Sequence, residues 1–225
     1  AKGSTPLAEM ERLIASDPRN AERIVPYIGG EEVNDSPTHA HHRYVINFED
    51  FPLRRKPLQP SWATAGEERR RLYLRSGEVP EDYPEPVAAD WPDLLRIVEE
   101  KVRPERAQNN REIYRRYWWQ YAERRPGLYD AIRGLPRVLA NCQVSQHVGF
   151  AFLPSDWVYA HTLNVYALAT HAAFCALQSR VHEVWARFFA SSMKDDLRYT
   201  PSDCFETFPF PEGFATDPKL KAAGE

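Results

Sequence analysis

The order of the hydrophobic patterns along the chain constrains its fold more than any other sequence feature. Strand-like runs at residues 24–34 and 43–48 precede a helical pair at 91–121, and further strand-like runs lead to an amphipathic segment at 172–190. This order lacks the regular alternation of strand and helix that builds a parallel sheet. The sequence therefore predicts an α+β fold, with a mixed or antiparallel β-sheet lobe, a central helical pair and a long C-terminal helix.

Breaks in these patterns give the expected domain organisation. An apolar helix face at residues 6–16 ends at Asp17-Pro18, so we expect residues 1–23 to be a linker helix from an upstream domain. Residues 24–211 are expected to form the main domain, and residues 212–225 a tail.

The middle and end of the main domain carry more specific expectations. Residues 51–90 are dense in Pro, Arg and Glu and have no clear period, which predicts a long loop or insertion with one helical turn near 67–74. Pro104 is expected to begin or to kink a second helix that runs toward Tyr121. The segment 172–190 is expected to be one helix with a single buried stripe. This stripe comprises Phe174, Leu177, Val181, Val184, Trp185 and Phe188.

Composition limits the class of protein. With 225 residues, 43% of them hydrophobic, the chain can form the core of one large or two small domains. No stretch approaches 18 consecutive apolar residues, and the first five residues lack the pattern of a signal peptide. We therefore expect a soluble, cytoplasmic protein with no membrane partner. The chain begins without Met and within helix-like sequence, which favours an excised fragment of a larger protein.

The charge distribution decides where a nucleic acid is able to bind. The formal net charge is −3, so DNA binding has to depend on local charge. Residues 101–137 carry ten Lys and Arg against four Asp and Glu. This surplus fits contacts to phosphates, and it fits a solvated helix face equally well.

Recognisable catalytic and metal-binding motifs are absent from the sequence. His39, His41 and His42 are close enough to suggest a metal site, but no cysteine or carboxylate stands at ligand spacing and there is no His-Glu-x-x-His motif. There is also no nucleophile elbow, phosphate-cradling loop, dinucleotide fingerprint or Asn-Pro-Pro-Tyr motif. We therefore expect no catalytic residue and no metal in this chain, while a hydrolase or metal enzyme that uses these histidines stays an alternative.

The cysteines are expected to be structural. Cys142, Cys175 and Cys204 are widely spaced and odd in number, which gives neither a disulfide framework nor a zinc knuckle. Buried thiols are the simpler interpretation.

The segment 194–199 combines hydrogen-bond donors and acceptors directly after the closing helix. Lys and Arg donate to the major-groove acceptors of guanine, and Asp accepts from the exocyclic amine of cytosine. The residues of this segment are therefore candidates for contacts to base edges.

Several motifs resemble a known family. They are PYIGGEEVN at 26–34, RYVINF at 43–48, WW at 118–119, RPGL at 125–128, PRVL at 136–139, VSQH at 144–147, GFAF at 149–152, SRVHEVW at 179–185, KDDLRY at 194–199 and FETFPFP at 205–211. In this order they resemble the target recognition domain of MmeI-like type II restriction-modification enzymes and related adenine-specific DNA methyltransferases, including those of phage-defence systems. The resemblance covers about residues 24–211 and leaves residues 51–90 unplaced.

The resemblance implies a division of labour within a parent enzyme. A methyltransferase catalytic domain in the same parent chain would bind S-adenosylmethionine and flip the target adenine, while this domain would recognise a sequence in double-stranded DNA. No cofactor is expected in this fragment. Whether the parent also cleaves DNA is left open.

The resemblance also implies which residues contact DNA. The specificity positions of the family fall on Lys194 and Asp196, for which we expect donation to a guanine and acceptance from its paired cytosine. Arg198 is expected either to join them or to brace the segment. Contacts to the DNA backbone or groove are expected from Arg43, Arg137, Ser145, Gln146 and His147. For Arg43 and Arg137, a structural ion pair is the alternative.

A binding module without DNA affinity is the rival interpretation. The acidic net charge supports a protein-interaction module of a defence complex. Salt-dependent binding to duplex DNA separates the two, because neutralising phosphates makes affinity fall steeply with salt.

Overall fold

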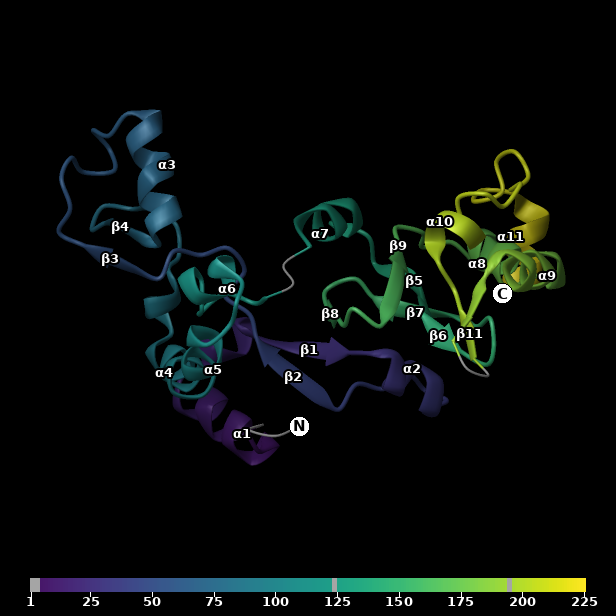
Figure 1. The fold of residues 1–225 in the computed structure, drawn as a ribbon, viewed down its shortest axis with the longest axis horizontal. Helices are drawn as coiled ribbons and strands as arrows, with labels where there is room; N and C mark the ends of the chain where they lie inside the picture. Colours follow the sequence, from purple (N-terminus) through teal and green to yellow (C-terminus); the bar gives the residue numbers. More distant parts are fainter. Residues whose placement is uncertain (1–4, 123–124, 194–195) are drawn as a thin grey trace. The chain divides into compact units, whose positions relative to one another are not determined.

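The structure is a computed structural model that describes residues 5–122, 125–193 and 196–225 (Figure 1). Its helices and several small sheets confirm the α+β fold class. The chain divides into two compact units. Unit 1 holds the described residues of Ala1–Val25 and Val45–Arg124, and unit 2 holds those of Pro26–Tyr44 and Arg125–Glu225. The domain boundaries expected after residues 23 and 211 remain predictions.

Unit 1 is largely helical. Its elements, with the two strands it shares with unit 2, are α1 (Leu7–Ser16), η1 (Pro18–Glu22), β1 (Ile24–Ile28), β2 (Arg43–Ile46), β3 (Arg54–Lys56), α3 (Glu67–Ser76), β4 (Glu78–Pro80), η2 (Ala88–Asp90), α4 (Pro92–Lys101), α5 (Arg103–Ala107) and α6 (Glu112–Arg116). The expected helix at 6–16 is confirmed as α1. One apolar cluster buries Leu13, Phe48, Trp91, Leu94 and Trp119.

The segment 51–90 is structured, so the prediction of a long loop there was wrong. The strands β3 and β4 pair in parallel, and α3 lies beside them (Figure 1). A small core of Ala65, Tyr73, Val79 and Val87 holds the segment together. The one helical turn expected near 67–74 corresponds to α3, which extends over Glu67–Ser76. Its full length was not predicted because Tyr73 is the one residue that α3 buries, so the helix has no apolar period to detect.

Gly77 and Trp119 join this segment to the rest of unit 1. Gly77 ends α3 with a left-handed φ of 75°, and a β-carbon at this position would overlap the Trp119 ring. The Trp119 indole Nε1 donates to the carbonyl oxygen of Phe51 at 2.9 Å. The packing at this turn therefore requires glycine.

The helix expected from Pro104 toward Tyr121 is divided into α5 and α6. Arg106 lies at the end of α5 and donates to the carbonyl oxygens of Trp118 (3.0 Å) and Gln120 (2.5 Å). These contacts fold residues 117–120 back against α5, which a continuous helix does not allow.

Unit 2 contains most of the sheet structure. Its elements are α2 (Gly30–Asp35), α7 (Pro126–Ile132), β5 (Arg137–Cys142), β6 (Val144–Ser145), β7 (Phe150–Pro154), β8 (Val158–Tyr159), β9 (Leu163–Tyr166), α8 (His171–Leu177), α9 (Arg180–Phe189), β10 (Ser191–Met193), β11 (Asp196–Arg198), α10 (Pro201–Cys204) and α11 (Pro218–Gly224). The strand β5 lies between β7 and β9 in an antiparallel sheet. The order of a second sheet is β10-β11-β6, and that of a third is β2-β1-β8.

The segment 172–190 forms two helices. The helix α8 ends at Leu177, and the Ser179 hydroxyl accepts a hydrogen bond from the backbone N–H of His182 to cap α9. Leu177 is buried as expected, but Val181, Val184 and Phe188 are 71, 60 and 80% exposed, so their predicted burial was wrong. Periodicity identified the apolar face of α9, but it does not show whether another element covers that face.

None of the helices described over 5–122, 125–193 and 196–225 is long and apolar enough to cross a membrane.

Candidate nucleic-acid interface

The described part of the segment expected as a recognition loop begins with the strand β11. The strands β10 and β11 are antiparallel, with Ser191 opposite Arg198. On its other edge β11 pairs with β6, where Leu197 stands opposite Ser145. Asp196 and Arg198 thus lie on one strand and alternate with Leu197. Lys194 lies outside the described residues.

A buried hydrogen-bond chain anchors the end of β11. The carbonyl oxygen of Leu177 is only an acceptor, so His182 donates to it through Nδ1 at 2.7 Å. The Nε2 atom of the neutral ring then accepts from the Tyr199 hydroxyl at 3.1 Å. Burial lowers the pKa of His182, which favours this neutral form.

The backbone of Tyr199 is also fixed. Its N–H donates to the carbonyl oxygen of Gln143 at 2.8 Å, and its carbonyl oxygen accepts from the side chain of Asn164 at 3.2 Å. Tyr199 is 2% exposed. Arg198, its neighbour, is exposed, so a rigid anchor lies one residue from a candidate DNA contact.

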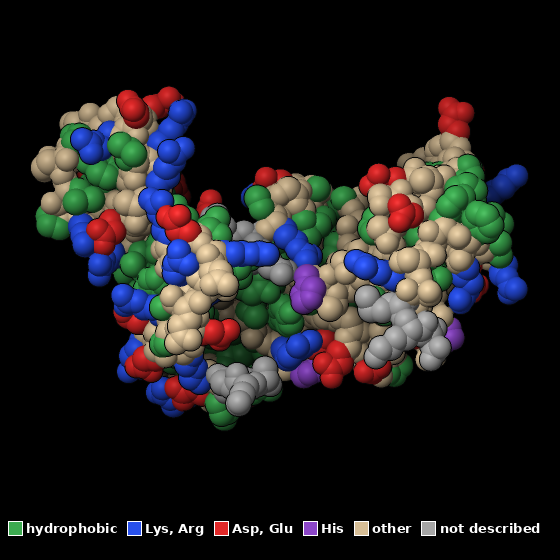
Figure 2. All heavy atoms as spheres, viewed as in Figure 1, with side chains coloured by type: hydrophobic (Ala, Val, Ile, Leu, Met, Phe, Trp, Pro, Cys, Tyr) green, Lys and Arg blue, Asp and Glu red, His purple; other side chains and the backbone are tan. Residues whose placement is uncertain are grey.

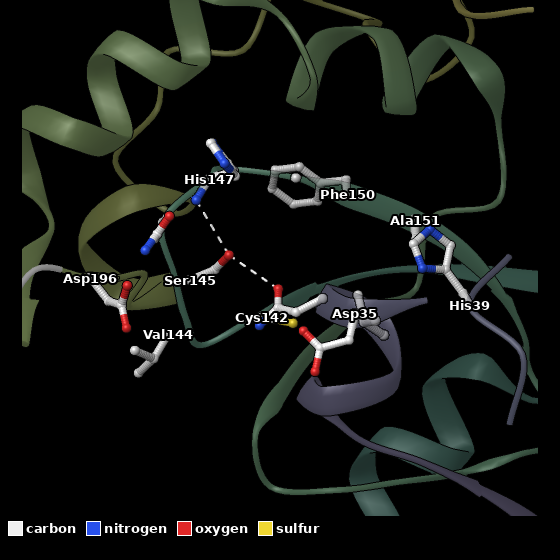
Figure 3. Close-up of a pocket in the computed structure, with 13 residues that line it drawn as sticks. Asp35, His39, Cys142, Val144, Ser145, His147, Phe150, Ala151 and Asp196 are labelled. Carbon is white, nitrogen blue, oxygen red and sulfur yellow. Dashed lines mark hydrogen bonds between the residues drawn. The ribbon is translucent and has the colours of Figure 1, made fainter. Parts of the chain in front are cut away.

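A groove of about 500 Å³ in unit 2 brings several predicted residues together (Figure 3). One wall comes from α2 and the segment after it, and another from β6, the following turn and the start of β7. Asp196 completes the lining. The lining residues are Val33, Asn34, Asp35, His39, Cys142, Val144, Ser145, Gln146, His147, Gly149, Phe150, Ala151 and Asp196.

Polar contacts join the two walls of the groove. The Ser145 hydroxyl donates to Oδ1 of Asn34 at 3.1 Å and accepts from the backbone N–H of His147 at 3.3 Å (Figure 3). Gln146 and His147 are exposed. The Nδ1 atom of His39 is buried and has no hydrogen-bond partner among the residues that the structure describes.

The charged side chains that line the groove are carboxylates. Asp35 and Asp196 both belong to the lining, whereas no Lys or Arg does among the described residues. Burial, with a smaller contribution from the charge of Asp35, raises the pKa of the Cys142 thiol to about 11. Cys142 is therefore a neutral thiol near pH 7.

Arg43 forms a structural ion pair with Glu32, which was the alternative to a DNA contact. Its guanidinium donates to both carboxylate oxygens of Glu32 at 2.6 Å and lies 4.9 Å from the ring centroid of Tyr27. Burial acts to raise the pKa of Glu32, but the hydrogen bonds from Arg43 and from the backbone N–H of Gly29 hold that pKa below its usual value. Glu32 is 3% exposed, so the pair fixes α2 beside β2.

The other two predicted arginines also lie outside the groove lining. The Nε atom of Arg137 donates to the carbonyl oxygen of Ala169 at 2.9 Å, and its guanidinium stacks 3.7 Å from the centroid of the Phe152 ring. Arg198 is exposed on β11, opposite Val144 of β6.

The groove lining also includes Asn34, Asp35 and His39, which were not among the predicted DNA contacts. Asn34 and Asp35 end α2, and Asn34 contacts Ser145 from 111 residues away in sequence. His39 was considered from the sequence as a candidate for a metal site. The sequence signal for all three was weak, because their place in the groove depends on this long-range pairing.

The histidines of the segment after α2 lie in different surroundings. The ring of His41 packs against Tyr44 and Trp157, and His42 lies 3.6 Å from Glu32. Over the described ranges, no group of three or more His, Cys, Asp or Glu side chains is arranged to hold a metal ion.

Comparison with known families decides the class of the domain. The model of the family described as MmeI, target recognition domain, matches residues 63–212, more than half of the chain. The chain belongs to this family. A solved structure, described as the type IIL restriction-modification enzyme MmeI in complex with DNA, is similar to the MmeI-type domain with a TM-score of 0.53 and 15% sequence identity. The similarity covers 91% of this chain and 22% of that chain. No curated protein matches the sequence.

The match to the MmeI family covers one wall of the groove. It includes β6, the turn after it and the β10–β11 hairpin, as well as α3 of unit 1. Asn34, Asp35 and His39 precede the matched residues. The groove of this MmeI-type domain is therefore built from a matched wall and from an N-terminal wall outside the match.

Proposed function

We propose that this chain recognises a specific sequence in double-stranded DNA. Its parent would be an adenine-specific DNA methyltransferase or a restriction-modification or phage-defence enzyme. The observation that carries the proposal is the groove in which Ser145, Gln146, His147 and Asp196 meet, in a member of the MmeI target recognition family. S-adenosylmethionine would bind the catalytic domain of the parent, and the residues of this chain would orient the duplex.

The charge of the groove favours contacts to base edges over contacts to phosphates. Two carboxylates in one lining repel phosphates, but each accepts a hydrogen bond from the exocyclic amine of cytosine or adenine. Ser145, Gln146 and His147 add groups that donate and accept. We infer that Asp196 accepts from a cytosine and that Lys194, two residues away, donates to the paired guanine.

The arginines have different proposed roles. Arg198 is exposed beside the anchor at Tyr199 and is free to join the base contacts. Arg43 holds Glu32, so its proposed role is to position the N-terminal wall of the groove. Arg137 is held by Ala169 and Phe152, and we infer the same kind of positioning role for it.

The test of this proposal measures sequence preference. A target duplex would first be selected from a randomised pool with the wild-type chain. Asp196→Ala should then reduce discrimination at one G·C pair by roughly 10- to 100-fold. Affinity for a mixed-sequence duplex should change little.

Asp130→Ala is the matched control, because Asp130 is an exposed carboxylate of unit 2 that is paired with Arg133. It should keep the wild-type preference. Selection that enriches no sequence, or equal losses on all duplexes for Asp196→Ala, would contradict the proposal.

A protein-interaction module is the second candidate, and the exposed face of α9 is the observation that favours it. Val181, Val184 and Phe188 together expose an apolar surface of the kind that partner proteins cover. Duplex binding whose affinity falls steeply with salt would favour the DNA-binding function, whereas a chain that binds no duplex at low salt would favour this one.

A further inference from the structure

Unit 1 carries a group of exposed arginines that the proposed function does not use. On α3, Arg71 and Arg75 are one helical turn apart, so their side chains emerge on the same face. Arg116 ends α6. We call Arg71, Arg75 and Arg116 the basic strip. All three are exposed, and Figure 2 shows basic side chains gathered over α3.

Tyr117 connects the two helices that carry the basic strip. Its hydroxyl donates to the carbonyl oxygen of Arg75 at 2.9 Å. The guanidinium of Arg116 lies 5.7 Å from the centroid of the Tyr117 ring. The end of α3 and the end of α6 are thus held together, and their arginines share one surface.

The charges of the basic strip are poorly neutralised within the protein. Arg71 is 3.4 Å from Glu67, but both side chains are more than 70% exposed, so this pair is weak. Arg75 and Arg116 form no ion pair with any residue of the described part of the chain. In a protein with a net charge of −3, neighbouring cations without carboxylate partners suit an external anion.

We infer that the basic strip is a second DNA contact, which binds backbone phosphates without regard to sequence. The planar guanidinium donates in a fork that matches a phosphate group, so three arginines on one surface fit a polyanion. The choice of DNA as the anion rests on the proposed function. The inference goes beyond it, because the groove contains carboxylates and lies in unit 2, while the basic strip lies in unit 1.

The chemistry of the strip leads to a specific expectation for salt dependence. Each phosphate contact releases counterions and adds about 0.9 to the slope of log affinity against log salt. Arg75→Gln combined with Arg116→Gln should therefore make this slope less steep by about 1.8. Affinity for a mixed-sequence duplex and for the selected target should fall by the same factor, which leaves the sequence preference unchanged.

Arg12→Gln combined with Arg96→Gln is the matched control. These two arginines also lie in unit 1, their side chains are 60 and 61% exposed, and each is already paired, with Glu9 and Asp93. The control removes the same charge and should keep the wild-type slope. Arg75→Lys with Arg116→Lys should keep most of the slope, because it preserves the charge.

The experiment measures anisotropy of a labelled mixed-sequence duplex and of the selected duplex, with the whole 225-residue chain, over a series of salt concentrations. If the double glutamine variant does not fold, Arg116→Gln alone tests the strip, with an expected change of about 0.9. A variant slope equal to that of the wild type and the control, in a chain that still prefers its target, overturns the strip alone. A wild-type chain that binds no duplex overturns the proposed function.

Discussion

The two units of this protein differ in the kind of charge they present. In unit 2 the groove is lined by Asp35 and Asp196 and by neutral polar groups. In unit 1 the basic strip presents arginines. Carboxylates accept from base amines and repel phosphates, while arginines bind phosphates in any sequence. The two proposals therefore assign sequence preference to unit 2 and general affinity for DNA to unit 1.

The largest expected effect comes from a substitution that destabilises unit 1 alone. Gly77→Ala places a β-carbon against Trp119 and forces a left-handed φ on a residue with a side chain. We expect it to lower the free energy of unfolding of unit 1 by about 2–4 kcal/mol. Denaturant unfolding measures this loss, and salt titration of DNA binding should show a less steep slope with the sequence preference kept.

Gly66→Ala is the control in the same unit, because the space around a β-carbon at Gly66 is open. It should cost less than about 1 kcal/mol. If both variants lose the same free energy of unfolding, the clash of a β-carbon at position 77 with Trp119 is not what destabilises unit 1.

Loss of the hydrogen bonds of His182 in unit 2 should lower the sequence preference and leave the salt dependence of binding unchanged. His182→Leu leaves the Leu177 carbonyl oxygen and the Tyr199 hydroxyl without their partner, and we expect a cost of about 2–3 kcal/mol. Discrimination between duplexes should fall because β11 loses its support, while the salt slope should stay. Thermal unfolding and competition between the target and a mixed-sequence duplex check the two effects.

His171→Leu is the matched control, since its ring is partly exposed and its ion pair with Glu225 at 3.6 Å is weak. A His182→Leu variant as stable and as selective as this control would refute the role of the anchor.

The same histidine predicts a pH dependence. Burial lowers the pKa of folded His182 below the unfolded value of about 6.5, so the unfolded chain takes up a proton that the folded chain does not. Its stabilising contribution is therefore complete above about pH 6.5 and declines below it, by at most about 1.4 kcal/mol per pH unit. Unfolding of wild type and His182→Gln across this range should give a smaller decline for the variant. Parallel curves would contradict the prediction.

The smallest expected effect concerns the ionisation of the Cys142 thiol in the groove. Because the pKa of Cys142 is raised to about 11, near pH 8 it should carry roughly 100-fold less thiolate than an ordinary cysteine. Labelling with iodoacetamide, followed by mass spectrometry, should be slow at Cys142. Asp35→Asn should accelerate it slightly, whereas Asp130→Asn should not. Unchanged labelling in Asp35→Asn would show that this carboxylate does not act on the groove.

The sequence predicted the elements whose apolar residues repeat with a local period. The helices α1 and α4 and the strand β2 lie close to their expected positions. The strand-like run at 24–34 holds β1 only up to Ile28, and its second half is part of the helix α2 (Gly30–Asp35), so the prediction was wrong there. Of the candidate site, Ser145, Gln146, His147 and Asp196 lie in one groove as lining residues, while their contacts to DNA remain predictions.

The remaining features depend on information that a local pattern does not contain. The charged helix α3 buries only Tyr73, so the sequence indicated one helical turn near 67–74 but not the whole helix or the strands beside it. Asp35 reaches the groove through the pairing of Asn34 with Ser145, which joins distant parts of the sequence. The apolar face of α9 was visible in the sequence, but burial is a property of the surrounding elements, and Val181 is exposed.

The anchor at Tyr199 has a consequence for substitutions on β11. A buried residue and an exposed residue are neighbours here. The side chain and backbone of Tyr199 form hydrogen bonds in the core, whereas Arg198 faces solvent. Substitution at Asp196 or Arg198 therefore changes the outward chemistry of β11 without removing a core contact of Tyr199. Exchange of these side chains would therefore alter the proposed base contacts while the support at Tyr199 keeps its hydrogen bonds.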